Sequence, residues 1–485
     1  MPKRREPSAQ WHVPLEAKEH GSPLTPVDIA WLRMDEPENR MHVHGVLVVE
    51  GDVDRDRIAD VLGQRLARIP RFSQRIADRK GDLVWTADRR FDLARHVLEE
   101  RLPEPGGDAE LAAVIERFLH EGFDRAHPPW AFHVLRGYRG GDTAILARLH
   151  HTIGDGVALM MVLLAMTDLA VSGPPAVTAA PELEPEPPLN PFLEILAEGP
   201  HAPLSRARET AEQWAPEMLR LMLSPAEAYS ELNLVWKALG ATRAIARILG
   251  NGSEPRTAFK GEIGVAKRVA WTERIAVEEV RAIGKKLGGT INDVLNTAMA
   301  GGLRRYLSRD SLPDEQLSFR VAMPVNLRLL PEMAALGNRF GLVFLDLPVG
   351  IHDPVRRLVA LRERSAELRH SVEPLVVLSL LDLAGRLPYS FQRLLVEIFG
   401  SRATAVFTNV PGPRRTLWIA GRPIRDMFFW VPQAGRLGLG VSILSYDGRV
   451  RMGVATDAGL VPDPGRIVDG FHAELDALAR AADRA

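Results

Sequence analysis

The chain contains no cysteine, although it is 485 residues long. This absence excludes disulfide bonds, thiol nucleophiles and zinc sites built from cysteine, and it fits a reducing compartment. Neither sign of charge dominates, because 61 Lys and Arg residues are balanced by 62 Asp and Glu residues. We therefore expect no nucleic-acid partner, since nucleic-acid-binding proteins usually need a basic excess.

Long uninterrupted apolar runs are also missing. A helix that spans a bilayer needs roughly 18 consecutive apolar residues. The nearest approach, residues 156–171, is shorter and contains Asp168, so we interpret it as a buried helix. The basic start of the chain is not followed by an apolar run, and we expect no signal peptide.

The periodicity of apolar residues predicts an α/β chain with two halves. In the first half, strands are expected at 41–51 and 143–150, and helices at 54–72 and 111–123. Residues 172–191 are rich in Pro and Glu and read as a linker, and helical patterns follow over 192–250. In the second half, strands are expected at 264–275, 317–328, 339–349, 404–413, 436–448 and 449–460, and helices at 276–288, 290–307, 354–372, 374–400 and 464–482. The resulting division is 1–171, a connector at 172–257, and 258–485.

Two adjacent histidines stand where the strand at 143–150 gives way to the next helix. The segment is His150-His151-Thr152-Ile153-Gly154-Asp155-Gly156, or HHxxxDG. A turn from strand to helix is a common place for reactive side chains, because the scaffold fixes the loop and the helix start supplies a positive dipole end. The glycines permit backbone angles that other residues resist and leave space for a ligand.

Three interpretations of this segment compete. One histidine is a general base, which takes a proton from a hydroxyl and returns it to a leaving group. Alternatively, His150, His151 and Asp155 bind a metal ion, although adjacent histidines at a strand end usually point to opposite sides and no further ligand cluster is evident. In the third interpretation the histidines are structural and Asp155 caps the helix. The whole pattern favours the general base, and no metal site is expected.

Several segments together resemble the bacterial wax ester synthase/diacylglycerol acyltransferases, which belong to the CoA-dependent acyltransferases with an HxxxD core. Besides HHxxxDG, the segments that match the family in order are PLTPVDIAWL near the start, PPWAFHVLRG, GTINDVLNTAMAGGLRRYL, MPVNLR, GNRFGLVF and TNVPGPRRTLWIAG. The resemblance implies an α/β (α+β) fold with two chloramphenicol-acetyltransferase-like domains and an active-site channel between them.

The same resemblance implies an O-acyltransferase that moves a long-chain acyl group from acyl-CoA to diacylglycerol or to a long-chain alcohol. His151 would be the general base, and no acyl-enzyme and no cofactor would be needed. Asp155 would hold the turn through an arginine, either Arg320 or Arg328, while His150 would support the turn or touch substrate. Gly156 would keep the channel mouth open. The other expected substrate-binding residues are Asn292, Asp293, Asn409, Pro411 and Gly412; helix capping is the plainer interpretation of Asn292 and Asp293, and loop chemistry of the last three.

Substrates with long apolar tails imply a cytoplasmic protein that meets the inner membrane face or a lipid droplet. Residues 236–250 have the composition of an interfacial helix, whereas packing between the domains is favoured for 374–399. The sequence is compatible with a homodimer. Two alternatives to the main function stay open: an acyltransferase for another lipid, polyketide or sugar hydroxyl, and a lipid-binding protein without catalysis.

Overall fold

The structure is a computed structural model in which residues 21–168, 254–309, 312–328, 336–368, 371–433, 435 and 437–485 are described. Within these residues the strands form two large sheets and one small sheet. The helical segment expected at 192–250 lies outside the described residues, as does nearly all of the connector expected at 172–257.

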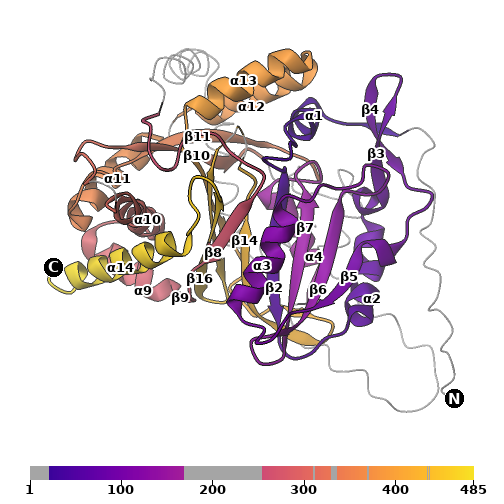
Figure 1. Cartoon of the computed structure of the whole chain (residues 1–485), viewed down its shortest axis with the longest axis horizontal. Helices are drawn as coiled ribbons and strands as arrows, with labels where there is room; N and C mark the ends of the chain where they lie inside the picture. Colours follow the sequence, from indigo (N-terminus) through magenta and orange to yellow (C-terminus); the bar gives the residue numbers. More distant parts are fainter. Residues whose placement is uncertain are drawn as a thin grey trace, which may run out of the picture.

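The first large sheet has the strand order β13-β14-β2-β7-β6-β5. Its strands are β2 (His42–Val49), β5 (Val97–Arg101), β6 (Trp130–Tyr138), β7 (Asp142–His150), β13 (Trp418–Ile419) and β14 (Arg422–Trp430). Helix α3 (Asp108–Leu119) packs on one face, and α2 (Arg55–Arg65) and α4 (Gly156–Met166) pack on the other (Figure 1). Because both faces are covered, nearly every residue of β7 is buried.

The second large sheet has the order β11-β10-β12-β15-β16-β8, with β9 beside β16. Its strands are β8 (Lys267–Trp271), β9 (Ile275–Ala276), β10 (Phe319–Asn326), β11 (Phe340–Leu347), β12 (Ala405–Pro411), β15 (Leu439–Tyr446) and β16 (Arg449–Asp457). One face packs against the helices α9 (Val277–Leu287), α10 (Ile291–Leu307), α11 (Pro354–Leu368) and α14 (Gly465–Ala482). These helices gather at the left of the molecule in Figure 1.

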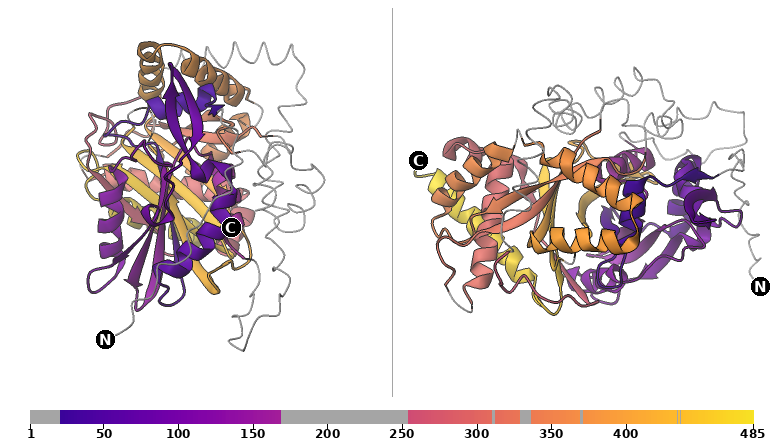
Figure 2. Two further views of the ribbon diagram at one scale, coloured as in Figure 1. Left: turned by 90° about the vertical axis from the view of Figure 1, so that its right-hand side faces the viewer. Right: turned by 90° about the horizontal axis from the view of Figure 1, so that it is seen from above.

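Two helices replace the single helix expected over 374–400. These are α12 (Glu373–Arg386) and α13 (Tyr389–Ser401). Leu387 ends α12 with an extended backbone, because the residue before a proline, here Pro388, avoids the helical region. Helix α12 packs on α1 (Pro26–Arg33) and on β11. Helices α12 and α13 form the upper end of the molecule (Figures 1 and 2).

Strand β14 belongs to the C-terminal part of the sequence but pairs with β2 in the first sheet. The expected division at 258 therefore describes the order along the chain, whereas in space the C-terminal half supplies two strands to the N-terminal sheet. The small sheet, β1 (Ser22–Pro23), β4 (Asp82–Ala87) and β3 (Gln74–Arg79), projects from the first half as a hairpin (Figure 1).

None of the helices in the described part of the chain is both long and apolar enough to cross a bilayer. Within the apolar segment at 156–171, Gly156–Met166 forms α4, whose residues pack into the core against the first sheet, and residues 169–171 lie outside the described part of the chain. The expectation of a buried helix at this place is confirmed.

Candidate active site

The HHxxxDG motif forms the turn from β7 to α4. Asp155 is the N-cap of α4, and its Oδ1 accepts a hydrogen bond from the backbone N–H of Ala158 at 3.0 Å. A Cβ at position 154 would lie 2.6 Å from the Cβ of Ala158, so the turn requires glycine there. A Cβ at Gly156 would meet Val410 at an ordinary 3.7 Å. The first glycine therefore permits the turn, and the second leaves space beside it.

The ring of His151 is fixed in one tautomer by Asn338. Its Nδ1 lies 2.8 Å from Oδ1 of Asn338. The Nδ2 of the same amide donates to the carboxylate of Asp28 at 2.8 Å and to the carbonyl of His151 at 2.7 Å, and these two acceptors fix which way the amide is turned. Oδ1 then only accepts, so Nδ1 carries the ring proton and the lone pair is on Nε2.

Aromatic side chains shield this imidazole from water. Trp31 stacks on His151 with 4.4 Å between ring centroids and 14° between ring planes, and Phe340 lies 5.6 Å away. Burial lowers the pKa of His151, and the charge of Asp155 and the hydrogen bond to Asn338 oppose this effect without cancelling it. The ring is therefore neutral at pH 7, the form in which it can accept a proton.

Asp155 has partners other than His151. Its Oδ2 accepts hydrogen bonds from Nε and Nη2 of Arg328, at 3.1 and 2.9 Å, and from the backbone N–H of Arg339 at 2.8 Å. Burial alone would raise the pKa of Asp155, but the charge of Arg328 and these hydrogen bonds lower it overall. Arg320 instead pairs with Asp346 at 3.2 Å. Of the two arginines expected as partners, Arg328 is the one that holds the turn.

A short segment of the C-terminal half lies against this turn. The backbone N–H of Gly337 donates to Ile153 at 3.0 Å, and that of Asp155 donates to Gly337 at 3.2 Å. Gly337 has a φ of +111°, which favours glycine. Since Asn338 and Arg339 follow directly, one short segment places contacts on both His151 and Asp155, and the site needs both halves of the chain.

A cavity of about 450 Å³ opens beside His151, a volume typical of small-molecule sites. Its walls come from both large sheets and from α1, α4, α12 and α13, and they are mostly apolar. Besides Trp31, the polar side chains on these walls are His151, Asp155, Asn326, Gln392, Thr408 and Asn409. The cavity lies between the two halves, where the sequence predicts a channel.

The other expected substrate-binding residues separate into two groups. Gly156, Asn409 and Pro411 line the cavity. Gly412 follows the last lining residue of β12, and its N–H donates to Oγ of Ser445 at 3.2 Å. Asn409 donates a hydrogen bond to the amide oxygen of Asn292, which is exposed and lies outside the lining. Asn292 therefore reaches the cavity only through Asn409.

Asp293 lies outside the cavity lining and completes a capping box. Its Oδ2 accepts from the N–H and the hydroxyl of Thr290, at 2.9 and 2.8 Å, and its own N–H donates to Oγ1 of Thr290 at 3.2 Å. These bonds provide hydrogen-bond partners for backbone N–H groups at the start of α10. Helix capping, rather than substrate binding, is therefore the interpretation that fits Asp293.

His150 is buried outside the cavity lining. Adjacent residues at the end of a strand point to opposite sides, and His150 consequently faces away from the wall on which His151 lies. Its Nδ1 is 2.8 Å from Oγ1 of Thr152. The expected support of the turn agrees with this position, whereas a direct contact with substrate does not.

The sequence interpretation assigned no role to Trp31, Asn338 or Asp28. All three lie in segments that resemble the family, PLTPVDIAWL and GNRFGLVF. Asn338 and Trp31 contact His151, and Asp28 accepts a hydrogen bond from Asn338. These contacts join residues far apart in the sequence, and a one-dimensional pattern does not show them. In the sequence, only the resemblance of these segments to the family points to a role for the three residues.

Comparisons with known proteins give matches over most of the chain. The model of the "Wax ester synthase/diacylglycerol acyltransferase catalytic domain" matches residues 24–295, and that of the "WS/DGAT C-terminal domain" matches 336–479. A Mycobacterium tuberculosis protein named as a diacylglycerol O-acyltransferase is 27% identical over 472 residues, which cover 94% of this chain and 95% of that protein.

Solved structures show the same fold. The wax ester synthase/diacylglycerol acyltransferase from Marinobacter aquaeolei VT8 is 23% identical with a TM-score of 0.66, and the match covers 95% of this chain and all of that one. The starter condensation domain of rhizomide synthetase, solved with C8-CoA and Leu-SNAC, is 13% identical with a TM-score of 0.54 over 95% and 93% of the two chains. Because the catalytic-domain model alone matches more than half of the sequence, the chain belongs to the wax ester synthase/diacylglycerol acyltransferase family.

Proposed function

We propose that this O-acyltransferase uses His151 as the general base that moves a long-chain acyl group from acyl-CoA to diacylglycerol, to a long-chain alcohol, or to both. The hydroxyl of the acceptor gives its proton to Nε2 of His151 while its oxygen attacks the thioester carbonyl carbon. When the tetrahedral intermediate collapses, the C–S bond breaks and the imidazolium returns the proton to sulfur. An ester and free CoA result, without a covalent acyl-enzyme and without a cofactor.

The observation that carries this proposal is a neutral imidazole, with its lone pair on Nε2, beside a mostly apolar cavity. Among the described side chains on the cavity wall, His151 alone offers a basic nitrogen. An apolar cavity suits acyl chains, and its low polarity strengthens the few electrostatic interactions made inside it.

The oxyanion of the intermediate needs hydrogen-bond donors. Helix α4 begins at Gly156 on the cavity wall, and the start of a helix presents free N–H groups and a positive dipole end. We assign the backbone of this first turn to the oxyanion and the amide of Asn409 to the acceptor side. Asp155 is a positioning residue in this scheme, because its carboxylate is already held by Arg328 and by two backbone N–H groups.

Release of free thiol from palmitoyl-CoA tests the function directly. We expect release that depends on an acceptor, measured with hexadecanol and with dioleoylglycerol in parallel, and ester product detected by mass spectrometry. Release only with a sugar or polyketide hydroxyl would favour an acyltransferase for another acceptor. Binding of palmitoyl-CoA with no turnover of any hydroxyl would contradict catalysis and favour a lipid-binding protein.

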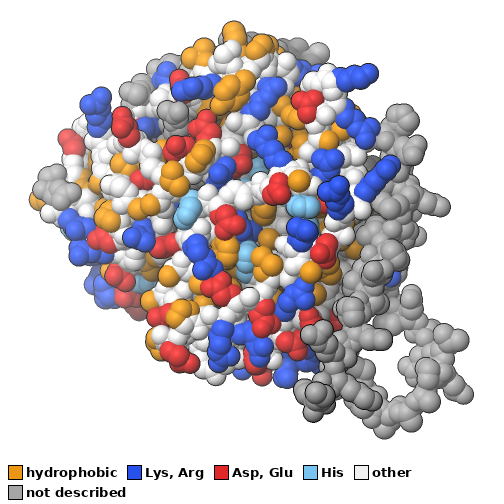
Figure 3. Space-filling view, turned by 45° about the vertical axis from the view of Figure 1, so that its right-hand side comes forward, with side chains coloured by type: hydrophobic (Ala, Val, Ile, Leu, Met, Phe, Trp, Pro, Cys, Tyr) orange, Lys and Arg blue, Asp and Glu red, His pale blue; other side chains and the backbone are white. Residues whose placement is uncertain are grey.

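We also propose that the protein works at the inner membrane face or at a lipid droplet, where its apolar substrates partition. Leu383, Tyr389, Phe391 and Leu394 are large side chains with 46% to 56% of their surface exposed. All four belong to α12 and α13, at the upper end of the molecule, where hydrophobic side chains gather in Figure 3. Other residues of the same helices, among them Leu380 and Ala384, line the cavity, so these two helices contact both solvent and cavity.

Replacing Phe391 and Leu394 by serine should weaken binding to phosphatidylcholine vesicles about tenfold, because insertion of these side chains contributes roughly 1.4 kcal/mol together. Co-sedimentation with vesicles measures the effect. Leu312→Ser is the matched control, since Leu312 is 80% exposed but lies outside α12 and α13. Equal losses in the control and the double variant would contradict the assignment of this surface.

A further inference from the structure

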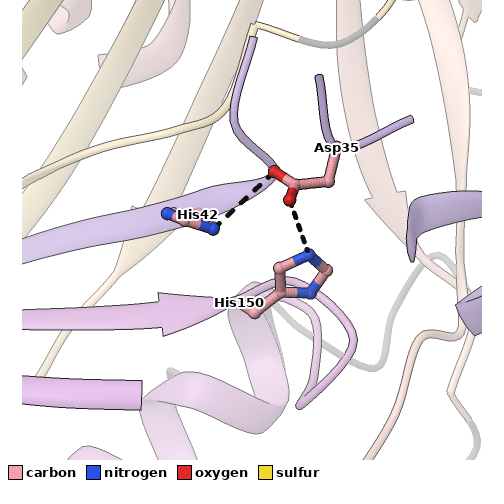
Figure 4. A group of neighbouring side chains, drawn as sticks. All are labelled: Asp35, His42 and His150. Carbon is pink, nitrogen blue, oxygen red and sulfur yellow. Dashed lines mark ion pairs between the residues drawn. The ribbon is translucent and has the colours of Figure 1, made fainter. Parts of the chain in front are cut away.

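Three side chains with metal-binding atoms meet at the HHxxxDG turn, and two of them are buried while the third, Asp35, is half-buried (Figure 4). None of the three belongs to the lining of the cavity. Asp35 follows α1, His42 begins β2 and His150 ends β7. One ligand atom from each lies within 4.8 Å of the other two. Nε2 of His42 is 3.7 Å from Oδ1 of Asp35, and Nε2 of His150 is 4.0 Å from Oδ2. This set differs from His150, His151 and Asp155, for which the sequence disfavours a metal site.

A second observation is that the histidine nitrogens facing the carboxylate have no hydrogen-bond partner. Both nitrogens of His42 and Nε2 of His150 are buried and unpartnered, and the side chains of His42 and His150 are 0% and 3% exposed. Leaving a buried polar atom without a partner costs free energy. The two Nε2 atoms that face the carboxylate of Asp35 therefore require an explanation that the acyl-transfer reaction does not supply.

From this arrangement we infer that Asp35, His42 and His150 form a binding site for one divalent transition-metal ion of the Zn²⁺ type. Two imidazoles and a carboxylate are a ligand set that zinc accepts, with water in a fourth position. Bonds of about 2.1 Å in a tetrahedral arrangement separate ligand atoms by about 3.4 Å, so the three side chains must move inward by a few tenths of an ångström. Burial keeps both rings neutral by lowering the pKa of His42 and that of His150, the latter to about 3, and neutral rings bind metals.

Two features oppose the ion and limit its affinity. Nη1 of Arg40 lies 3.4 Å from Oδ2 of Asp35, and the positive charge of Arg125 also acts on this carboxylate. In addition, the backbone N–H of Thr152 donates to Nδ1 of His150 at 3.1 Å. In the metal-bound form Nδ1 instead carries the proton and donates it to the Thr152 hydroxyl at 2.8 Å. We therefore expect an affinity in the micromolar range, with Arg40 as the main competitor.

A bound ion would brace the active-site turn from behind. His42 and His150 face each other across β2 and β7, and the carbonyl of Met41 accepts the N–H of His151 at 2.7 Å. An ion would join the loop after α1 to both strand ends next to His151. This inference is independent of the proposed acyl transfer, because it concerns binding on the opposite side of the turn.

Calorimetric titration of the chelator-treated full chain with ZnCl₂ tests the site. We expect one equivalent to bind and to raise the midpoint of thermal unfolding. Asp35→Asn and His42→Ala should each weaken binding at least about tenfold, whereas Arg40→Gln should strengthen it about threefold by removing the competing cation. His127→Ala is the matched control, because it removes an imidazole near two other carboxylates, Asp88 and Asp124, that form no such cluster.

Arg40→Gln is expected to raise the affinity for Zn²⁺ and Asp35→Asn to lower it, so the test stays decisive if one of the two variants folds poorly. Circular dichroism checks the fold of each variant, and the visible spectrum of bound Co²⁺ reports tetrahedral imidazole coordination. Absence of binding in the wild-type chain would overturn the inference. Binding that is unchanged in both Asp35→Asn and Arg40→Gln would overturn it equally, because the ion would then lie elsewhere.

Discussion

His151→Ala should reduce the rate of acyl transfer about 10²- to 10⁴-fold, the range that general bases usually contribute. The loss should appear in kcat at saturating palmitoyl-CoA, because the imidazole acts on the proton of the acceptor rather than on substrate binding. Steady-state thiol release measures it, with His127→Ala as a matched control: His127 is partly exposed and pairs with Asp88. Full activity of His151→Ala would remove this residue from the mechanism.

The pH dependence of the acyl-transfer rate is a second test of the role of His151. A base must be unprotonated, and burial holds the pKa of His151 below its ordinary value of 6.5. The wild-type rate should therefore be level around neutral pH and fall only as the pH drops through this lowered pKa, below about 6.5. The variant His151→Ala should lose this acidic limb from its residual rate. A limb that persists in the variant would belong to another group.

The sequence predicted the region of the site better than its internal contacts. The HHxxxDG segment located the turn, the glycines and the N-cap at Asp155, because these features depend on residues close together in the chain. The sequence does not distinguish Arg320 from Arg328 as the partner of Asp155, because both lie within the predicted strand 317–328. Asn338 sets the tautomer of His151 from 187 positions away, and no local pattern encodes that contact.

For the fold too, the sequence predicts local elements better than contacts between distant segments. Strands that are buried along nearly their whole length, such as β7 and β16, agree with the predicted ranges within one to three residues. Strand β14 was missed, and with it the connection of the two halves, because its partner β2 lies almost four hundred positions earlier and its final residues, Met427 to Trp430, are apolar without alternation. The break between α12 and α13 could have been predicted, because Pro388 marks it.

Arg328→Met should destabilise the protein by about 3–5 kcal/mol, since it leaves the buried carboxylate of Asp155 without its cation. The two side chains are only 2% and 4% exposed. Their pairing lowers the pKa of Asp155 below its usual 3.8, so the pair stabilises the folded state above about pH 4. That contribution should disappear as the pH falls through the lowered pKa. Urea unfolding at pH 7 and at lower pH measures both effects.

A double variant separates a positioning role from a chemical one. In Asp155→Asn/Arg328→Met the asparagine still caps α4, and both charges of the buried Asp155–Arg328 pair are removed together. It should therefore be more stable than Arg328→Met alone, the sign expected when two residues interact directly. Breaking the exposed pair Arg386–Asp382 in the same way should leave the unfolding midpoint unchanged, because solvent screens that pair.

If acyl transfer recovers with stability in the double variant, the carboxylate of Asp155 takes no part in the proton transfer, and its role is to hold the turn on which His151 stands. Stability without activity would instead place that negative charge in the reaction itself.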